Sequence, residues 1–494
     1  TVAGTSNVVA TIDTVNANID TAFVAGAVAT ITLTAPVNGA VADGADTNQV
    51  DALVQDANGN AITGAAVVFS SANGADIIAP TMNTGVNGVA STLLTHTVAG
   101  TSNVVATIDT ISANIDTAFV AGAVATITLT APVNGAVADG ADTNQVDALV
   151  EDANGNPITG AAVVFSSANG ATILSSTMNT GVNGVASTLL THTVAGTSNV
   201  VATVDTVNAN IDTTFVAGAV ATITLTTPVN GAVADGANSN SVQAVVSDSD
   251  GNPVTGAAVV FSSANATAQI TTVIGTTGAD GIATATLTNT VAGTSNVVAT
   301  IDTVNANIDT AFVAGAVATI TLTAPVNGAV ADGVNTNSVQ AVVSDSGGNP
   351  VTGATVVFSS TNATAQITTV IGTTGADGIA TATLTNTVAG TSNVVATIDT
   401  VNANIDTAFV AGAVATITLT APVNGAVADG VNTNSVQAVV SDSGGNPVTG
   451  ATVVFSSTNA TAQITTVIGT TGADGIATAT LTNTVAGTSN VVAT

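Results

Sequence analysis

The feature that most constrains this chain is an internal repeat. The eleven residues TVAGTSNVVAT begin at Thr1 and recur at steps of 96, 96, 97, 97 and 97 residues, starting at Thr97, Thr193, Thr290, Thr387 and Thr484. A period of this length lies within the common size range of a single domain. The chain is therefore predicted to be a tandem array of domains, and the array is the main indication of its function.

Each unit has the pattern of a series of short β-strands. In residues 28–34, Ala29, Ile31 and Leu33 share one face while three threonines share the other, and no sustained 3.6-residue period occurs. Clusters of Gly, Asn, Asp and Pro separate such runs and favour turns, because Gly and Asn accept positive φ and Pro fixes φ. One unit contains seven such runs: ATITLT, NQVDALV, AAVVFSS, a short run near Ile77, GVASTLLT, TSNVVATID and NIDTAFV. This pattern predicts an all-β fold, a tandem array of seven-stranded immunoglobulin-like sandwiches.

The boundaries follow from the short Ala-Gly-Ala joint between NIDTAFV and the next ATITLT. Residues 1–26 are predicted to be the last two strands of an incomplete domain, and the complete repeats to span 27–122, 123–218, 219–315 and 316–412, with a repeat lacking its last strand at 413–494. Because the chain opens and closes on the same eleven residues, we expect it to be a segment of a longer repeat protein. The repeats beginning at 27 and 123 carry NQVDALV and are called first-version repeats; the later ones carry NSVQAVV and are called second-version repeats.

The composition excludes several classes of function. The 494 residues include 30 acidic residues and no Lys or Arg, so the formal charge is −30. Nucleic acids and anionic membranes are recognised through basic residues, so neither is an expected partner. No apolar run approaches the roughly 18 residues of a spanning helix, so we expect no membrane insertion in this segment. There is no Cys, which excludes disulfides.

The core of each unit is predicted to be thin. The hydrophobic residues are mostly Ala and Val, with 10 Phe and no Trp or Tyr. Two Phe fall in each unit, and we expect an aliphatic core around one Phe pair, formed by Phe69 with Phe119 and by Phe165 with Phe215.

Three motifs carry a resemblance to a known family: ADGADTNQVDALVEDANGNPITGAAVVFSS at Ala138–Ser167, TGVNGVASTLLT at Thr180–Thr191 and AGTSNVVATV at Ala195–Val204. As a string they resemble the bacterial Ig-like domain group 1, which is found in the stalks of intimin- and invasin-type surface proteins. The resemblance covers every repeat and implies an extracellular, cell-surface stalk of seven-stranded sandwiches. The absence of Lys and Arg and the near-identity of the repeats depart from familiar members.

Acidic residues suggest two candidate cation sites. Asp56-x-Asn58-x-Asn60 has the opening spacing of a calcium loop, but Val67 stands where the acidic twelfth ligand is needed, so a strand-connecting turn is favoured. No cofactor is expected to be required for folding. The better candidates for weak calcium contacts, which the chain is expected to gather near a joint, are Asp43, Asp46, Asp109 and Asp116.

The sequence gives no support for an enzyme. His96 and His192 occur once per first-version repeat, which is too few for a two-His metal site, and each is expected to be a solvent-facing residue at a strand end. The abundant Ser and Thr have no base placed to activate them.

We therefore expect a structural repeat segment of an extracellular stalk or filament. Some strands are apolar on both faces, which predicts that copies of the chain pack laterally into a multi-chain fibre through Leu149, Val164, Val245 and Val260. Donor-strand exchange between chains fits less well, because the N-terminal stretch supplies a redundant TSNVVATID strand. The alternative function is an adhesin module that binds a host, surface or carbohydrate partner through loops at a domain end.

Overall fold

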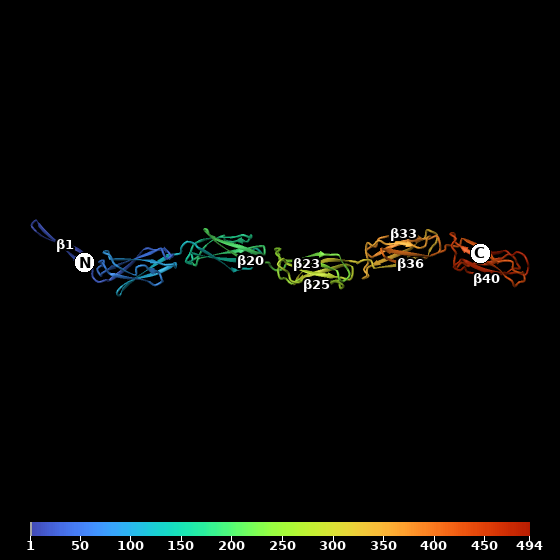
Figure 1. Cartoon of the computed structure of the whole chain (residues 1–494), viewed down its shortest axis with the longest axis horizontal. Helices are drawn as coiled ribbons and strands as arrows, with labels where there is room; N and C mark the ends of the chain where they lie inside the picture. The colour runs from blue at the N-terminus through green and yellow to red at the C-terminus, as the bar shows by residue number, and fades with distance from the viewer. Residues whose placement is uncertain (1) are drawn as a thin grey trace. The chain divides into compact units, whose positions relative to one another are not determined.

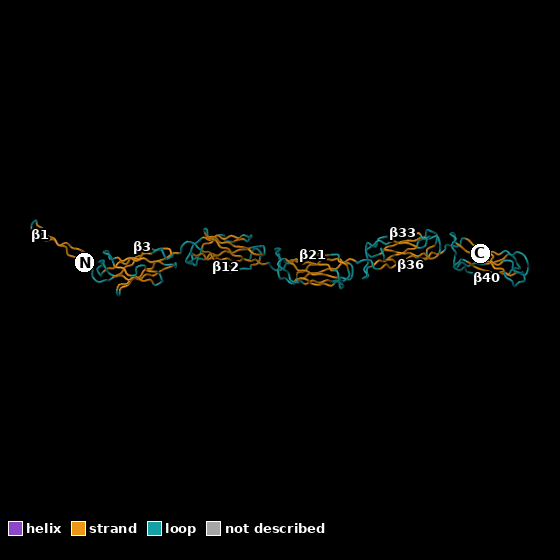
Figure 2. Tube along the Cα trace, viewed as in Figure 1, coloured by secondary structure: helices purple, strands orange, loops and turns teal. Residues whose placement is uncertain are grey.

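The computed structural model describes residues 2–494, and each repeat in this range folds as its own β-domain (Figure 1). Strands and loops account for all of these residues (Figure 2), so the range contains no helical segment that could cross a membrane. Two compact units are present. The first runs through residue 222 and also contains Val246–Gly256 and Ala279–Gly281, and the second contains the rest.

The first complete repeat shows how the alternating sequence becomes a two-sheet sandwich. One sheet has the strand order β3-β5-β9-β7 and the other β4-β11-β10-β6-β8. All of these pairings are antiparallel except that of β4 with β11, which is parallel. The strands are β3 (Thr30–Val37), β4 (Ala40–Val41), β5 (Asn48–Gln55), β6 (Ala66–Ser71), β7 (Asp76–Ile77), β8 (Thr81–Asn83), β9 (Val89–Thr95), β10 (Gly100–Ile108) and β11 (Ile111–Val120).

The second repeat has the same topology, with sheets ordered β12-β14-β18-β16 and β13-β20-β19-β15-β17. Its strands are β12 (Thr126–Val133), β13 (Ala136–Val137), β14 (Asn144–Glu151), β15 (Ala162–Ser167), β16 (Thr172–Ile173), β17 (Thr177–Asn179), β18 (Val185–Thr191), β19 (Gly196–Val204) and β20 (Val207–Val216).

The second-version repeats differ in one edge strand. The third repeat has sheets β21-β23-β26-β25 and β22-β28-β27-β24, and the fourth has β29-β31-β34-β33 and β30-β36-β35-β32. Their strands are β21 (Thr222–Val229), β22 (Ala232–Val233), β23 (Ser239–Ser247), β24 (Val260–Ser263), β25 (Gln269–Ile274), β26 (Ile282–Thr288), β27 (Gly293–Ile301), β28 (Val304–Val313), β29 (Thr319–Val326), β30 (Ala329–Val330), β31 (Asn337–Ser344), β32 (Val357–Ser360), β33 (Gln366–Ile371), β34 (Ile379–Thr385), β35 (Gly390–Ile398) and β36 (Val401–Val410).

The extra residue of the second version falls in the segment that forms this edge strand. First-version repeats split the segment into two short strands on different sheets, whereas second-version repeats form one six-residue strand, β25 or β33, on a single sheet. The predicted count of seven strands is therefore too low. First-version repeats have nine strands and complete second-version repeats have eight.

The last repeat contains sheets β37-β38-β41-β40 and β39-β42, and the chain starts with a two-stranded hairpin, β1-β2. These strands are β1 (Gly4–Ile12), β2 (Val15–Phe23), β37 (Thr416–Val423), β38 (Asn434–Ser441), β39 (Phe455–Ser457), β40 (Gln463–Ile468), β41 (Ile476–Thr482) and β42 (Val491–Ala493). Strand β1 is exposed along its whole length, although the identical sequence in β10 is buried at alternate positions beside β6.

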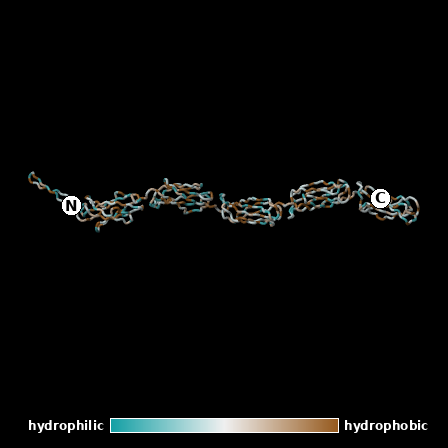
Figure 3. The backbone as a smooth tube through the Cα atoms, viewed as in Figure 1, coloured by the Kyte–Doolittle hydropathy of each residue, from teal (hydrophilic) through white to brown (hydrophobic). Residues whose placement is uncertain are grey.

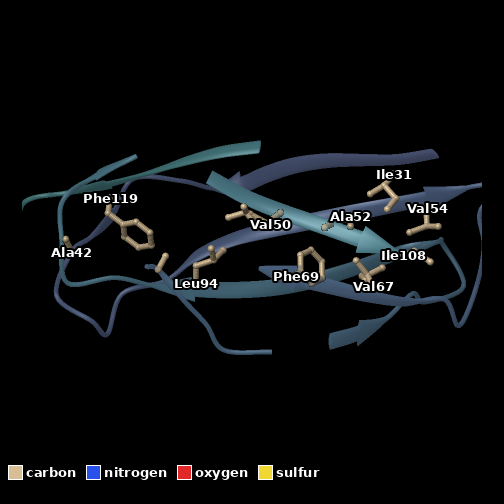
Figure 4. Close-up of a cluster of buried hydrophobic side chains, with 14 residues drawn as sticks. Ile31, Ala42, Val50, Ala52, Val54, Val67, Phe69, Leu94, Ile108 and Phe119 are labelled. Carbon is tan, nitrogen blue, oxygen red and sulfur yellow. The ribbon is translucent and has the colours of Figure 1, made fainter. Parts of the chain in front are cut away.

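The core lies between the two sheets of each repeat and is built from the inward-facing alternate residues. On β5, Val50, Ala52 and Val54 are completely buried, and burial alternates along the strand. Figure 3 shows hydrophobic and hydrophilic residues interspersed within each repeat. Phe69 and Phe119 are 2% and 3% exposed and belong to one cluster. Figure 4 shows that Phe119 lies toward one end of this core and Phe69 near Val67, so the two rings occupy different parts of it. Phe165 and Phe215 are buried equivalently in the second repeat.

Candidate functional site at the joints between repeats

The loop after β14 lies next to a joint and is densely hydrogen-bonded. Asp152 follows the strand directly, and its Oδ1 accepts hydrogen bonds from the amides of Asn154 and Asn156, both at 2.9 Å. Gly155 lies between them at a φ of 81°, which glycine adopts without strain. An aspartate that binds amides two and four residues ahead fixes a tight turn. Hydrogen bonds within the loop therefore fix its conformation independently of the preceding repeat.

The same two side chains then bind the preceding repeat. Asp152 Oδ2 accepts a 2.8 Å hydrogen bond from the amide of Gly122 in the linker. Asn156 Oδ1 accepts from the amide of Ala99 at 2.8 Å, and Asn156 Nδ2 donates to the carbonyl of Thr97 at 3.0 Å. Asn156 Nδ2 also donates to Asp152 Oδ2 at 2.9 Å. We call Asp152 and Asn156, with their equivalents, the joint pair.

The joint pair is buried and closely packed. Asp152 and Asn156 are each 4% exposed, which is unusual for polar residues unless their groups are hydrogen-bonded. A Cβ at Gly122 would lie 3.3 Å from Val41 Cγ1 and 3.6 Å from Asp152 Cβ. The linker is therefore in van der Waals contact with the loop, and the tight contact for a side chain at this position would be with Val41 of the preceding repeat.

The arrangement recurs at every joint. In each case the aspartate accepts from the linker glycine at 2.8–2.9 Å, and the asparagine accepts from an alanine amide of the preceding TVAG stretch at 2.7–2.8 Å. At the third joint the loop Val246–Gly256 even belongs to the same compact unit as the preceding repeat. The other joint pairs are Asp56–Asn60, Asp248–Asn252, Asp345–Asn349 and Asp442–Asn446.

The joint carboxylates are held in their charged form. Burial alone raises the pKa of Asp152, but the hydrogen bonds from Gly122, Asn156 and Asn154 together outweigh it and lower the pKa below its ordinary value. At the first joint the Asn60 side chain and the Gly26 amide lower the pKa of Asp56 strongly. Amide donors thus stabilise these carboxylates in a chain without Lys or Arg.

The sequence predicts the turn at Asp56-x-Asn58-x-Asn60 but not its contacts with the neighbouring repeat. One signal could have revealed them. The Asp and the second Asn are identical in all five loops, whereas the position between them, Asn154 in the second repeat, is Asp250 or Gly347 in later repeats. A turn alone does not require the second asparagine of the loop. Its presence in all five loops, although the residue before Gly varies, therefore indicates a further contact.

The structure does not bring the four predicted cation ligands together. Asp43 and Asp46 share a loop, where the amides of Ala45 and Asp46 bind Asp43 Oδ1 at 2.7 Å and lower the pKa of Asp43. Asp109 occupies the turn of the β10-β11 hairpin at a φ of 50°. The other end of β11 pairs with β4 beside the Asp43 loop, so the hairpin length of roughly 30 Å separates the two acids.

Asp116 is exposed in the middle of β11 and accepts a 2.7 Å hydrogen bond from Asn103 Nδ2. Within residues 2–494, no three His, Cys, Asp or Glu side chains are grouped closely enough to hold a metal ion. The expectation that a joint gathers Asp43, Asp46, Asp109 and Asp116 is therefore wrong, because these residues are distributed along the length of one domain.

The two histidines are not fully solvent-facing, contrary to expectation. His96 and His192 are half-buried, and each ring packs edge-on against a core phenylalanine, Phe119 or Phe215, with centroids 5.7 Å apart. His192 Nδ1 also accepts a 3.1 Å hydrogen bond from the amide of Thr193. Each histidine ring therefore covers one end of the hydrophobic core of its repeat.

The residues predicted to make lateral contacts lie on two different faces. Leu149 on β14 and Val245 on β23 point outward from the sheet that contains β12 or β21, and both are half-buried. Val164 on β15 and Val260 on β24 point outward from the opposite sheet and are 48% and 64% exposed. No single flat contact can cover both sets within one domain.

Comparison with known proteins gives one family and several solved structures. The family model "Bacterial Ig-like domain (group 1)" matches residues 30–120, 126–216, 222–313, 319–410 and 416–494. Among solved structures, the Escherichia coli adhesin FdeC is 24% identical over 59% of this chain and 99% of its own, with a TM-score of 0.45. Invasin, described as a bacterial integrin-binding protein, is 22% identical over 81% and 82%, with a TM-score of 0.42. Yersinia pseudotuberculosis InvD is 20% identical over 57% and 96%, with a TM-score of 0.41.

Proposed function

Because the chain belongs to the bacterial Ig-like domain (group 1) family, we propose that it is the repeat region of an extracellular stalk or filament on a bacterial cell surface. The observation that supports this most is the buried joint pair, which ties each repeat to the one before it by the same hydrogen bonds. In such a chain, polar side chains at every joint are hydrogen-bonded to the preceding domain. This arrangement is suited to limiting movement between successive domains.

The role we infer is structural rather than catalytic. The polar groups that are buried at recurring positions bind backbone amides and carbonyls, and they leave no nucleophile paired with a base. The half-buried histidines contact phenylalanine rings. Folding as a stalk would need neither a cofactor nor a metal ion.

The joint pair gives the stalk proposal a direct test. The full chain should be compared with a variant in which Asn156, Asn252, Asn349 and Asn446 are all replaced by Ala. Each replacement removes a buried acceptor and donor, which we expect to cost about 1–3 kcal/mol at that joint and to make it flexible. Small-angle X-ray scattering should then show a shorter maximum dimension and a broader distance distribution.

A matched control is available in the loop itself. Replacing Asp250 by Gly creates the residue that Gly347 and Gly444 already provide at the equivalent positions. Asn154 is left unchanged, because its Nδ2 donates to the Ala42 carbonyl of the preceding repeat at 3.0 Å. This variant should scatter like the unmodified chain. Equal scattering from the asparagine variant and the unmodified chain would contradict a role for the joint pair in stiffness. Antibody labelling of intact cells tests the location, and labelling only after lysis would contradict it.

We further propose that copies of the chain pack laterally into a multi-chain fibre. Large apolar side chains remain exposed at equivalent positions of successive repeats, as with Val68, Val164 and Val260 at 49%, 48% and 64%. Recurring exposed apolar residues favour contact between copies. Electron microscopy over a concentration series tests this proposal, and single unbundled chains at every concentration would contradict it.

A further inference from the structure

One sheet of the second-version repeats has an outer face without any charge. In the third repeat this sheet is β21-β23-β26-β25, and burial alternates along β23 and β26, which separates inward from outward residues. The outward residues of β23 include Gln243, Val245 and Ser247, and those of β26 include Ile282 and Thr284. Most other outward positions of the four strands are Thr, Ser or Gln, and the exposed Val229, Val273 and Ile274 add apolar area at the strand ends without adding charge. We call this surface the hydroxyl face.

The first-version repeats provide a natural comparison, because the same face is acidic there. Asp147 and Glu151 point outward from β14 at the positions that Gln243 and Ser247 occupy on β23. The strand pairing is the same in both versions. The charge has therefore been replaced without a change of fold, and the replacement recurs in the fourth and fifth repeats.

The hydroxyl face is also ordered by cross-strand contacts. Val245 lies opposite Ile282, and Gln243 lies opposite Thr284. At the edge of the face the hydroxyls of Thr222 and Ser247 are hydrogen-bonded at 2.5 Å. Hydroxyl and amide side chains both donate and accept, so a surface made of them is complementary to a copy of itself.

The distribution of charge limits which partners can bind the hydroxyl face. The chain carries 30 acidic and no basic residues, and the opposite sheet of the third repeat presents Asp309. A second copy is repelled wherever carboxylates meet and can approach closely only where they are absent. A cationic partner would prefer the carboxylates, and a carbohydrate-binding surface usually offers aromatic rings, which this face lacks.

We propose that the hydroxyl face of the second-version repeats is the surface on which a second copy of this chain docks. This inference rests on the proposed lateral packing and makes it specific. The contact uses Val245 and its neighbours, and the second-version repeats provide it rather than the first. Val260 is more exposed, but it lies on the opposite sheet, which presents Asp309. Three such faces in one chain would act together, so a weak contact per domain gives a stable association.

The test restores the first-version residue. In the full chain, Gln243, Gln340 and Gln437 are all replaced by Asp, the residue that Asp51 and Asp147 provide in folded first-version repeats. The charge control replaces Asn210, Asn307 and Asn404 by Asp. These exposed residues lie on β20, β28 and β36, in the opposite sheets of the second, third and fourth repeats. Sedimentation equilibrium in about 0.15 M salt measures self-association. We expect the glutamine variant to weaken it at least about tenfold and the asparagine variant to weaken it far less.

The outcomes separate the two proposals. Equal weakening by both variants would overturn the assignment of the face while leaving lateral packing intact. An unmodified chain that stays monomeric at every concentration would overturn lateral packing and the docking face together. The chain could instead stay monomeric and adsorb to microcrystalline cellulose or chitin. If the Gln→Asp replacements abolished this adsorption, the face would be assigned to carbohydrate binding instead of self-association.

Discussion

At the scale of single residues, the two versions of the repeat differ in how they satisfy one buried serine. In the third repeat Ser295 Oγ accepts hydrogen bonds from Asn289 Nδ2 and Asn265 Nδ2, both at 3.1 Å. In the first repeat His96 replaces that asparagine, and the completely buried Ser102 Oγ has no partner among the described residues. An unsatisfied buried hydroxyl lowers stability.

Replacing His96 and His192 by Asn should therefore stabilise the first-version repeats. Each new amide can donate to the adjacent serine, as in the second version, and we expect a gain of about 1 kcal/mol per domain. Calorimetry of the full chain should show the first-version transition moving to higher temperature. The reverse change, Asn289→His, should lower the stability of the third repeat, and an increase there would contradict the explanation.

The core phenylalanines allow a second prediction at this scale. Phe165 is 2% exposed, and Phe165→Ala should destabilise the second repeat by about 3–5 kcal/mol through lost burial and a cavity. The neighbouring Val164 is 48% exposed, so Val164→Ala should change stability by less than about 0.5 kcal/mol. Denaturant unfolding of both variants decides the matter, and a loss below about 1 kcal/mol for Phe165→Ala would show that the ring is not essential to the core.

At the scale of elements, the joint loop couples stability to pH. Hydrogen bonds to Asp152 lower its pKa in the folded joint below the ordinary value of 3.8. A group whose pKa is lowered on folding stabilises the folded state above its unfolded pKa, and this stabilisation is lost as the pH falls through the folded pKa. The joint should therefore be insensitive to pH between about 8 and 5 and weaken below about 4.

Hydrogen exchange at the Gly122 and Ala99 amides, corrected for the intrinsic rate, measures this weakening. Both amides are bonded to the joint pair, so their protection should fall as Asp152 is protonated. Asp152→Asn removes the titrating group and should leave little pH dependence at this joint. A loss of protection already at pH 6, or an unchanged acid profile in Asp152→Asn, would contradict the assignment to this carboxylate.

The sequence predicts long alternating elements well and short or non-local ones poorly. Strands such as β5 and β10 were predictable, because an alternating run with turn residues at its ends has few other stable conformations. Strand β4 has only two residues and β8 only three, which is too short for a period to be recognised. The contacts of the joint pair were missed because its partners are backbone groups of another domain, and only the recurrence of the same Asp and Asn in all five loops indicates them.

At the scale of the whole chain, the net charge of −30 should make stability depend on salt. Raising the ionic strength from about 0.01 M to about 0.5 M shortens the screening length from roughly 30 Å to below about 8 Å. Repulsion among the carboxylates then weakens, and the melting temperature should rise by a few degrees. Sodium chloride titrations followed by calorimetry test this, and a melting temperature that is indifferent to salt would contradict it.

Calcium and magnesium provide the control for specific binding. Because residues 2–494 contain no close group of three His, Cys, Asp or Glu side chains, both ions should raise the melting temperature equally at the same ionic strength. A larger effect of calcium, abolished by Asp43→Asn, would show a specific site in the Asp43 loop.

The joint also determines how such a chain can change its length. The preceding repeat contributes only backbone groups, such as the Thr97 carbonyl and the Ala99 amide, while the specific side chains all come from the following repeat. After a first-version repeat, the same hydrogen bond to the linker glycine is made by Asp152 of a first-version repeat and by Asp248 of a second-version repeat. Residues 290–397 and 387–494 are identical, so recombination between their coding sequences would remove or add one whole period. Each crossover would rebuild a complete joint, and a gene of this kind can gain or lose domains without ever encoding a mismatched pair of neighbours.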